Sequence, residues 1–204
     1  MRGLTKMLFL PGAGASATFW RPVADRLDPG RMRHFFAWPG LGNEPPDPSI
    51  RGLDDLVAMV VAELDEPADL IAQSIGGLVA LCVALTVPHK IRRLVLTATS
   101  GGVPVDDLGG SDWRPEYRRE FPNAASWITQ DMRIREDLSS RLTSISAPSL
   151  LIWGDSDTIS PLPVGYRLHQ LLACADLHVV RGGGHDLART HAVEIAPRIA
   201  DHLC

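Results

Sequence analysis

Three side chains that could together form a hydrolytic site follow apolar stretches of the sequence. Ser74 comes directly after ADLIAQ, Asp157 comes shortly after SLLIWG, and His185 follows LHVV through a run of glycines. A serine hydroxyl is a weak nucleophile at neutral pH, so it needs an imidazole to accept its proton, and the imidazole needs a carboxylate to fix its tautomer. These residue types therefore indicate nucleophilic catalysis if the fold brings them together. Asp155, two residues before Asp157, is an alternative source of the carboxylate.

The stretch AQSIGG is suited to hold Ser74 on a sharp turn between a strand and a helix. Ala72 and Gly76 are small, as such a turn requires where the helix and a neighbouring strand approach closely. An oxyanion that forms during acyl transfer also needs preset donors. We expect these to be the amide of Ile75, at the positive end of the following helix, and the amide of Ala13, in the turn PGAG. The alternative is that Ser74 only caps an ordinary polar turn.

The elements that must position these residues alternate along the chain. Nearly all-apolar runs predict strands at 7–10, 31–38, 68–73, 91–99, 147–155 and 175–180, and helical spacing predicts helices at 17–27, 49–64, 75–87, 161–173 and 191–203, with Ser16 capping the first. Strands that are apolar on both faces are typical of a parallel sheet covered by helices on both sides. In such α/β folds, reactive groups gather where the strands end, at the carboxyl edge of the sheet.

Residues 101–145 interrupt this alternation. The segment is polar and contains Pro104, Pro115 and Pro122, and we interpret it as an insertion on a single domain that spans residues 1–204. Its aromatic residues could line a substrate pocket or only pack the insertion onto the body; they are Trp113, Tyr117, Phe121 and Trp127. Its arginines could bind a substrate carboxylate or form a solvated face; they are Arg114, Arg118 and Arg119.

The composition excludes several other classes of protein. The chain has 204 residues, 45% of them hydrophobic and 22% charged, with a formal net charge of −4, which is typical of a globular domain. No basic stripe is interleaved with aromatic residues, so we expect no nucleic-acid partner, and no apolar stretch approaches the ~20 residues of a membrane span. Three cysteines without metal-like spacing favour a reducing, cytoplasmic location. The glycine-rich stretches match neither a dinucleotide nor a phosphate motif, and we expect no cofactor and no metal.

Five motifs in this order resemble those of the α/β-hydrolase family. AQSIGG is similar to the nucleophile elbow, with Ala72 in place of the usual first glycine. LFLPGAGASATFW resembles the oxyanion segment, with Pro11 where histidine is usual, and FFAWPGLGNEPPDP resembles a second conserved loop without its aspartate and histidine. APSLLIWGDSDTISP and VVRGGGHD resemble the acid and histidine segments.

The resemblance implies a serine hydrolase in which Ser74 is the nucleophile, His185 the general base and then acid, and Asp157 the residue that orients His185. The matched motifs start at the family's third strand, so we expect a sheet of about six strands. The segment at the position of the family's cap is short, which favours an open pocket and small or elongated esters. The expected reaction is cleavage of a small-molecule carboxylic ester or thioester through an acyl-enzyme. The alternatives are hydrolysis of a lactone, an amide or a carbon–carbon bond, and a non-catalytic ligand-binding member of the same fold.

Overall fold

A parallel sheet of six strands forms the centre of the computed structural model, which describes residues 5–131, 134 and 136–204. The strand order is β2-β1-β3-β4-β5-β6, and every neighbouring pair is parallel. The strands are β1 (Met7–Leu10), β2 (Arg33–Phe35), β3 (Ala68–Gln73), β4 (Ile91–Thr97), β5 (Ser149–Gly154) and β6 (Ala175–Val180). The fold class and the sheet of about six strands that the sequence predicts are both confirmed.

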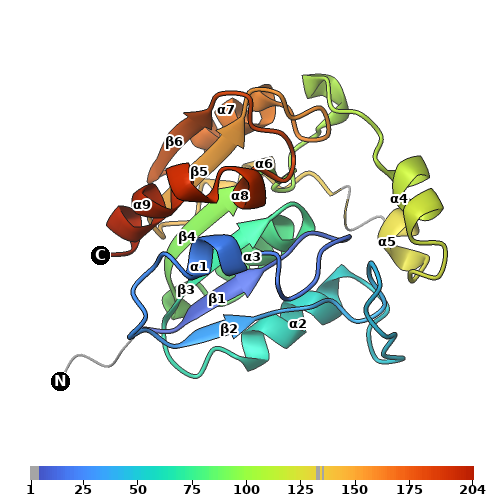
Figure 1. The fold of residues 1–204 in the computed structure, drawn as a ribbon, viewed down its shortest axis with the longest axis horizontal. Helices are drawn as coiled ribbons and strands as arrows, with labels where there is room; N and C mark the ends of the chain where they lie inside the picture. Colours follow the sequence, from blue (N-terminus) through green and yellow to red (C-terminus); the bar gives the residue numbers. More distant parts are fainter. Residues whose placement is uncertain (1–4, 132–133, 135) are drawn as a thin grey trace.

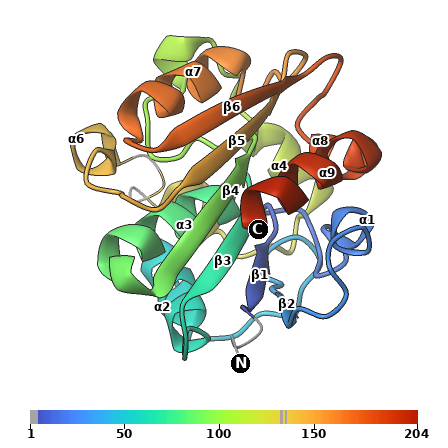
Figure 2. The same ribbon diagram turned by 90° about the vertical axis from the view of Figure 1, so that its left-hand side faces the viewer.

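Helices cover both faces of this sheet (Figure 2). One face carries α2 (Leu53–Ala62), α3 (Ile75–Thr86), α6 (Ser139–Leu142) and α7 (Leu162–Leu171), and the other carries α1 (Arg21–Ala24), α8 (Leu187–Thr190) and α9 (Ala192–Leu203). Each layer encloses its own apolar cluster. The central strands β3 and β5 are buried along their whole length, which explains why their sequences are apolar on both faces.

The first predicted helix is much shorter than the pattern over 17–27 indicates. Only Arg21–Ala24 is helical, and Trp20, not Ser16, is the residue before its first turn. Pro22 has no amide proton, so it fits only the start of a helix, and the helix begins one residue before it. Ser16 instead shares a hydrogen bond of 2.8 Å between its hydroxyl and that of Thr18, within a series of tight turns.

The second predicted helix, over 49–64, begins four residues later than expected, at Leu53. The amide and hydroxyl of Ser49 both donate to the carboxylate of Asp47, at 2.8 and 2.7 Å, so the chain forms a side-chain turn there. The amide of Leu53 donates to Asp131 from the segment between β4 and β5. The helix therefore starts later than its apolar spacing predicts, because the side chains of Asp47 and Asp131 bind the backbone amides that precede or begin it.

The segment between β4 and β5 contains short helices that the sequence reading did not predict. They are the 3₁₀ turn η2 (Asp106–Leu108) and the helices α4 (Arg114–Glu120), α5 (Trp127–Gln130) and α6. A further 3₁₀ turn, η1 (Pro88–Lys90), lies between α3 and β4. Figure 1 shows α4 and α5 beyond the end of the sheet, on the side opposite both chain termini. The described helices include none that is long and apolar enough to cross a membrane.

Candidate active site

Ser74 occupies the turn between β3 and α3. Its backbone has φ 54° and ψ −123°, a conformation that is costly for a residue with a side chain, by roughly 1–3 kcal/mol. The neighbouring strand holds it there: the Ser74 amide donates to the carbonyl of Thr97 at 3.1 Å, and the hydroxyl of Thr99 donates to the carbonyl of Ser74 at 2.6 Å. The strained turn therefore depends on hydrogen bonds from β4 and the loop that follows it.

The two glycines after this turn are required by close packing. A Cβ atom on Gly76 would lie 2.5 Å from the carbonyl oxygen of Leu10, and one on Gly77 would lie 2.6 Å from the hydroxyl oxygen of Thr99. Contacts this short do not occur in folded proteins without displacement of one partner. The approach of α3 to β1 is thus the physical reason for the small residue that the sequence places two positions after Ser74.

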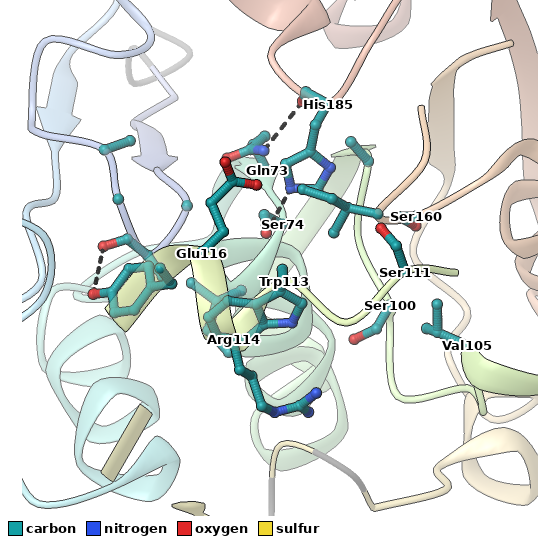
Figure 3. A pocket seen from close by; sticks show the side chains of 18 of the residues that line it. Gln73, Ser74, Ser100, Val105, Ser111, Trp113, Arg114, Glu116, Ser160 and His185 are labelled. Atoms are coloured by element: carbon teal, nitrogen blue, oxygen red, sulfur yellow. Dashed lines mark hydrogen bonds between the residues drawn. The ribbon is translucent and has the colours of Figure 1, made fainter. Parts of the chain in front are cut away.

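His185 lies in the loop between β6 and α8 and bridges the other two predicted residues. Its Nε2 atom is 3.1 Å from the Ser74 Oγ (Figure 3). Its Nδ1 atom lies 3.0 Å from Oδ2 and 3.2 Å from Oδ1 of Asp157. A carboxylate can only accept, so Nδ1 carries the proton of this contact and Nε2 is free to accept the serine proton. The structure brings Ser74, His185 and Asp157 into one chain of contacts.

The two aspartates that the sequence left open have different partners. The side chain of Asp157 is fully buried, and its Oδ1 accepts the amides of Ile159 and Ser160 at 2.8 and 3.0 Å. Asp155 points to the histidine loop instead, where its Oδ1 accepts the amide of Gly182 at 2.7 Å. Asp157 is therefore the aspartate that contacts the imidazole, and Asp155 ties the two loops together.

Gln73 contributes a contact that the sequence reading missed. Its side chain is buried at the end of β3, and its Nε2 donates to the main-chain carbonyl of His185 at 3.3 Å (Figure 3). This bond links the strand that carries the serine to the loop that carries the histidine. The available signal was an amide side chain at the end of a largely apolar strand, because buried polar groups in such places need partners.

The two amides expected to bind an oxyanion lie beside Ser74. Ile75 is the first residue of α3, and Ala13 lies in the turn after β1. A Cβ atom on Gly12, next to Ala13, would lie 3.3 Å from the Cβ of Ser74, which shows how close this turn approaches the serine. Within the described part of the chain, neither amide has a hydrogen-bond acceptor. Both are thus available to a ligand atom, and the amino end of α3 adds positive potential.

A cavity of about 440 Å³ opens over these residues. Ser74, His185, Ala13 and Ile75 line its base. The insertion supplies one wall through three aromatic residues spaced four apart on and beside α4: Trp113, Tyr117 and Phe121. Trp127 does not line the cavity and is packed against the larger apolar cluster. All four aromatic residues of the insertion thus pack against the body, and three of them also line the cavity.

The charged residues of the cavity wall are mostly acidic. Four carboxylates line it, those of Asp106, Glu116, Glu120 and Asp186, against the two guanidinium groups of Arg114 and Arg189. Arg114 is paired with Asp112 at 2.9 Å, and Arg119, outside the cavity, is paired with Glu116 at 3.0 Å. In Figure 3, Glu116 extends from α4 on the side of Ser74 and His185, whereas Arg114 extends away from them. Among the residues that the structure describes, no group of three or more His, Cys, Asp or Glu side chains is arranged to hold a metal ion.

Comparison with known proteins places the chain in a family. A model of the family described as the alpha/beta hydrolase family matches residues 7–198. A pimeloyl-[acyl-carrier protein] methyl ester esterase of Neisseria meningitidis serogroup B is 27% identical over an alignment 241 positions long, which covers 97% of this chain and 92% of that protein. A 2-hydroxy-6-oxononadienedioate/2-hydroxy-6-oxononatrienedioate hydrolase of Paraburkholderia phymatum is 29% identical, covering 95% of this chain and 83% of that protein.

Solved structures share the fold. A bromoperoxidase from Bacillus anthracis superposes with a TM-score of 0.80 at 17% identity, covering 98% of this chain and 91% of that one. A meta-cleavage product hydrolase from Pseudomonas fluorescens superposes with a TM-score of 0.75 at 19% identity, covering 98% and 90%. At these identities the likeness extends to the arrangement of strands and helices.

Proposed function

Because this chain belongs to the alpha/beta hydrolase family, we propose that it is a serine hydrolase that cleaves a small-molecule carboxylic ester or thioester through an acyl-enzyme. Ser74 is the nucleophile, His185 the general base and acid, and Asp157 the residue that orients His185. The observation that carries the proposal is the pair of imidazole contacts, 3.1 Å to the Ser74 hydroxyl and 3.0 Å to the Asp157 carboxylate. A hydroxyl, an imidazole and a carboxylate in this order can activate the hydroxyl at neutral pH.

In the proposed reaction, the Ser74 oxygen attacks the ester carbonyl carbon while its proton passes to Nε2 of His185. The carbonyl oxygen becomes an oxyanion, which the amides of Ala13 and Ile75 stabilise. The intermediate then expels the alcohol or thiol, which takes the proton from Nε2. A water molecule then attacks the acyl-serine and gives one proton to the same nitrogen. The second intermediate expels the Ser74 oxygen, which takes that proton back from Nε2, and the carboxylic acid is released. Asp157 stabilises the imidazolium in both halves of the reaction.

The relatives suggest two bond types, and the charge of the cavity favours one of them. One relative is named for hydrolysis of a methyl ester and the other for hydrolysis of a dioate. A dioate carries two negative charges, whereas the cavity wall has four carboxylates and two guanidinium groups. All four acidic residues are exposed, so they repel a like charge weakly, by an amount that salt screens. We therefore favour an ester with an uncharged acyl group and keep carbon–carbon bond hydrolysis as the second candidate.

We further propose that the chain is a single hydrolase domain on which residues 101–145 act as a short cap. The lining of the cavity by residues on and beside α4 supports this assignment. The three cysteines, an odd number without metal-like spacing, support a reducing, cytoplasmic location. The expected partner is the small-molecule substrate itself.

The nucleophile is tested by replacing Ser74 with alanine. We expect Ser74→Ala to lower kcat for p-nitrophenyl acetate by at least about 10³-fold, because no other group then forms the acyl-enzyme. Ser74→Ala should also abolish labelling by a fluorophosphonate probe, while the wild-type peptide that contains Ser74 carries the label in a mass spectrum.

Ser100→Ala is the matched control, because Ser100 lines the same cavity without contacting His185. It should keep both turnover and labelling. A folded wild-type protein that reacts with neither ester nor probe would favour the ligand-binding alternative, and an active Ser74→Ala variant would contradict the assigned nucleophile.

A further inference from the structure

Four successive carbonyl groups, from Leu10 at the end of β1 to Ala13 in the turn that follows, accept hydrogen bonds. The Trp20 indole donates to the Leu10 carbonyl at 3.0 Å, and the Trp38 indole donates to the Pro11 carbonyl at 2.8 Å. The Ala15 amide donates to the Gly12 carbonyl at 3.2 Å and closes a four-residue turn. The fourth donor, to the carbonyl of Ala13, is the hydroxyl of Tyr117 at 3.3 Å. Tyr117 belongs to the insertion, whereas the other donors belong to the body.

The peptide that Tyr117 holds is the middle peptide of that turn. In a four-residue turn, rotation of the middle peptide interconverts types I and II, and the type II form needs a positive φ at the third residue, where glycine is favoured. The third residue here is Gly14, which lies outside the positive-φ region in this structure. The turn is therefore in its unflipped form, and its sequence also permits the flipped one.

Rotation of this peptide would change the electrostatics of the site. Ala13 and Gly14 both line the cavity beside Ser74. The carbonyl and amide of one peptide point in opposite directions, so a flip would exchange the sides to which the Ala13 oxygen and the Gly14 amide point. The Ala13 amide belongs to the preceding peptide, so the flip would act on the site through the adjoining dipole: a carbonyl oxygen turned toward the oxyanion would weaken its stabilisation.

We propose that Tyr117 is a positioning residue that locks the oxyanion turn in its catalytic form, and that this is a function of the insertion. The inference rests on the proposed function, because it takes the Ala13 amide as an oxyanion donor. The lock is the hydrogen bond from the Tyr117 hydroxyl to the Ala13 carbonyl, which the turn would have to break in order to flip.

The surroundings of Tyr117 support a fixed hydroxyl. The residue is 7% exposed, and its oxygen also accepts the amide of Gly42 at 2.9 Å. An accepted bond polarises the hydroxyl and strengthens the bond it donates. Burial raises the pKa of Tyr117 above its usual value of 10.0, so the hydroxyl keeps the proton that it donates over the range of an esterase assay. The Phe121 ring, whose centroid is 5.1 Å from that of Tyr117, lies so near Gly14 that a Cβ there would be 2.9 Å from it.

The test removes only the hydroxyl. We expect Tyr117→Phe to lower kcat for p-nitrophenyl acetate about tenfold with KM changed less than about twofold. This loss is smaller than the ~10²–10³-fold for complete removal of an oxyanion donor, because the unflipped turn stays populated. Binding of a trifluoromethyl ketone, whose adduct with serine carries an oxyanion, should weaken by the same factor. Tyr166→Phe is the matched control: Tyr166 is the other tyrosine of the chain, is 51% exposed and lies outside the cavity lining, and it should keep wild-type values.

A double-mutant cycle separates this lock from a merely structural contact. Alanine at position 14 disfavours the positive φ that the flip requires. In the Gly14→Ala background, Tyr117→Phe should therefore lower kcat only about twofold, whatever Gly14→Ala itself costs through Phe121. An equal loss in both backgrounds, or an unchanged ketone affinity in Tyr117→Phe, would overturn the proposal. A wild-type protein without esterase activity would instead contradict the proposed function.

Discussion

Ser74 shows how strongly a single residue of this site depends on its neighbours. It is one of two described non-glycine residues with a positive φ. The other is Ala98, and the next residue, Thr99, donates a hydrogen bond to the Ser74 carbonyl. Ser74 and Ala98 both line the cavity. Unfavourable backbone conformations persist only where surrounding hydrogen bonds enforce them, and they gather at functional sites. The strain at Ser74 is thus the cost of presenting the hydroxyl to His185.

Substitution of each aspartate of the acid segment by asparagine, which replaces one oxygen by an NH₂ group, tests which of them orients His185. The Oδ1 of Asp157 accepts two amides, so in Asp157→Asn the amide oxygen should take that position and the NH₂ group should face His185. That group is a donor, and it would force the proton of the imidazole onto Nε2, which could then no longer accept from Ser74. We expect kcat to fall about 10³- to 10⁴-fold in a steady-state ester assay.

Asp155→Asn should behave differently. An asparagine at this position keeps an oxygen that can accept the Gly182 amide, as Asp155 does at 2.7 Å. We expect kcat within about fivefold of the wild-type value, because the change leaves His185 and Asp157 in place. If Asp155→Asn lost more activity than Asp157→Asn, the assignment of Asp157 as the orienting residue would be wrong.

At the scale of elements, the acid segment and the histidine loop meet through their backbones. Gly154, the last residue of β5, lies against the carbonyl of Gly183 with no room for a side chain. The amide of Ser156 also donates to Gly183 at 3.0 Å, and the amide of Asp155 donates to Val180 at 3.2 Å. The distance between Asp157 and His185 is therefore set by main-chain contacts between two loops.

Substitution of Gly154 tests this arrangement. A Cβ in Gly154→Ala would overlap main-chain atoms of Gly183, and these atoms cannot move without the histidine loop. We expect the free energy of unfolding to fall by about 2–3 kcal/mol in urea titrations, in the range of overpacking substitutions, and kcat to fall as His185 moves away from Ser74.

Gly184→Ala provides the comparison from the same loop. A Cβ on Gly184 would meet no heavy atom within 4 Å, and its φ lies outside the positive region. The free energy of unfolding should change by no more than about 0.5 kcal/mol. Equal destabilisation by the two substitutions would show that backbone contact at Gly154 does not set the approach of the loops.

At the scale of the whole molecule, the chain has a net charge of −4. The residues that line the cavity include two more acidic than basic residues. Glu116 and Glu120 lie one turn apart on α4, and both side chains are exposed at the mouth. Charges in solvent interact weakly, by roughly 0.2–1 kcal/mol each, and salt screens them. They should therefore adjust selectivity by small factors and leave the chemical step unchanged.

A pair of esters of similar size measures this effect. We expect a butyrate ester to be hydrolysed with a higher kcat/KM than the corresponding hemisuccinate, which carries a carboxylate. The double substitution Glu116→Gln and Glu120→Gln should raise kcat/KM for the hemisuccinate about two- to tenfold, and high salt should reduce the gain.

Glu66→Gln is the matched control, because Glu66 is exposed and precedes β3 at the opposite edge of the sheet. It should change neither substrate's kcat/KM. A wild-type preference for the hemisuccinate would contradict the favoured substrate charge and support the dioate-hydrolysing candidate.

The sequence alone determined the strands, their parallel arrangement and the three reactive residue types at their ends. This was possible because burial on both faces of the sheet demands continuous apolar runs, and because a parallel sheet collects its loops at one edge. That periodicity also identified Ser74 and His185 as site candidates. It did not predict the short helices of the insertion or the true length of α1, since packing and single polar contacts decide such short elements.

Only the tertiary structure decided which side chains touch. The contact between Ser74 and His185 joins residues 111 positions apart, and the bond from Tyr117 to Ala13 spans 104 positions. The choice of Asp157 over Asp155, the link through Gln73 and the acidic wall of the cavity depend on side-chain directions at the ends of separate loops. Local sequence patterns show the hydrophobic period of a helix or strand. Contacts between distant loops depend on how the helix layers pack against the sheet.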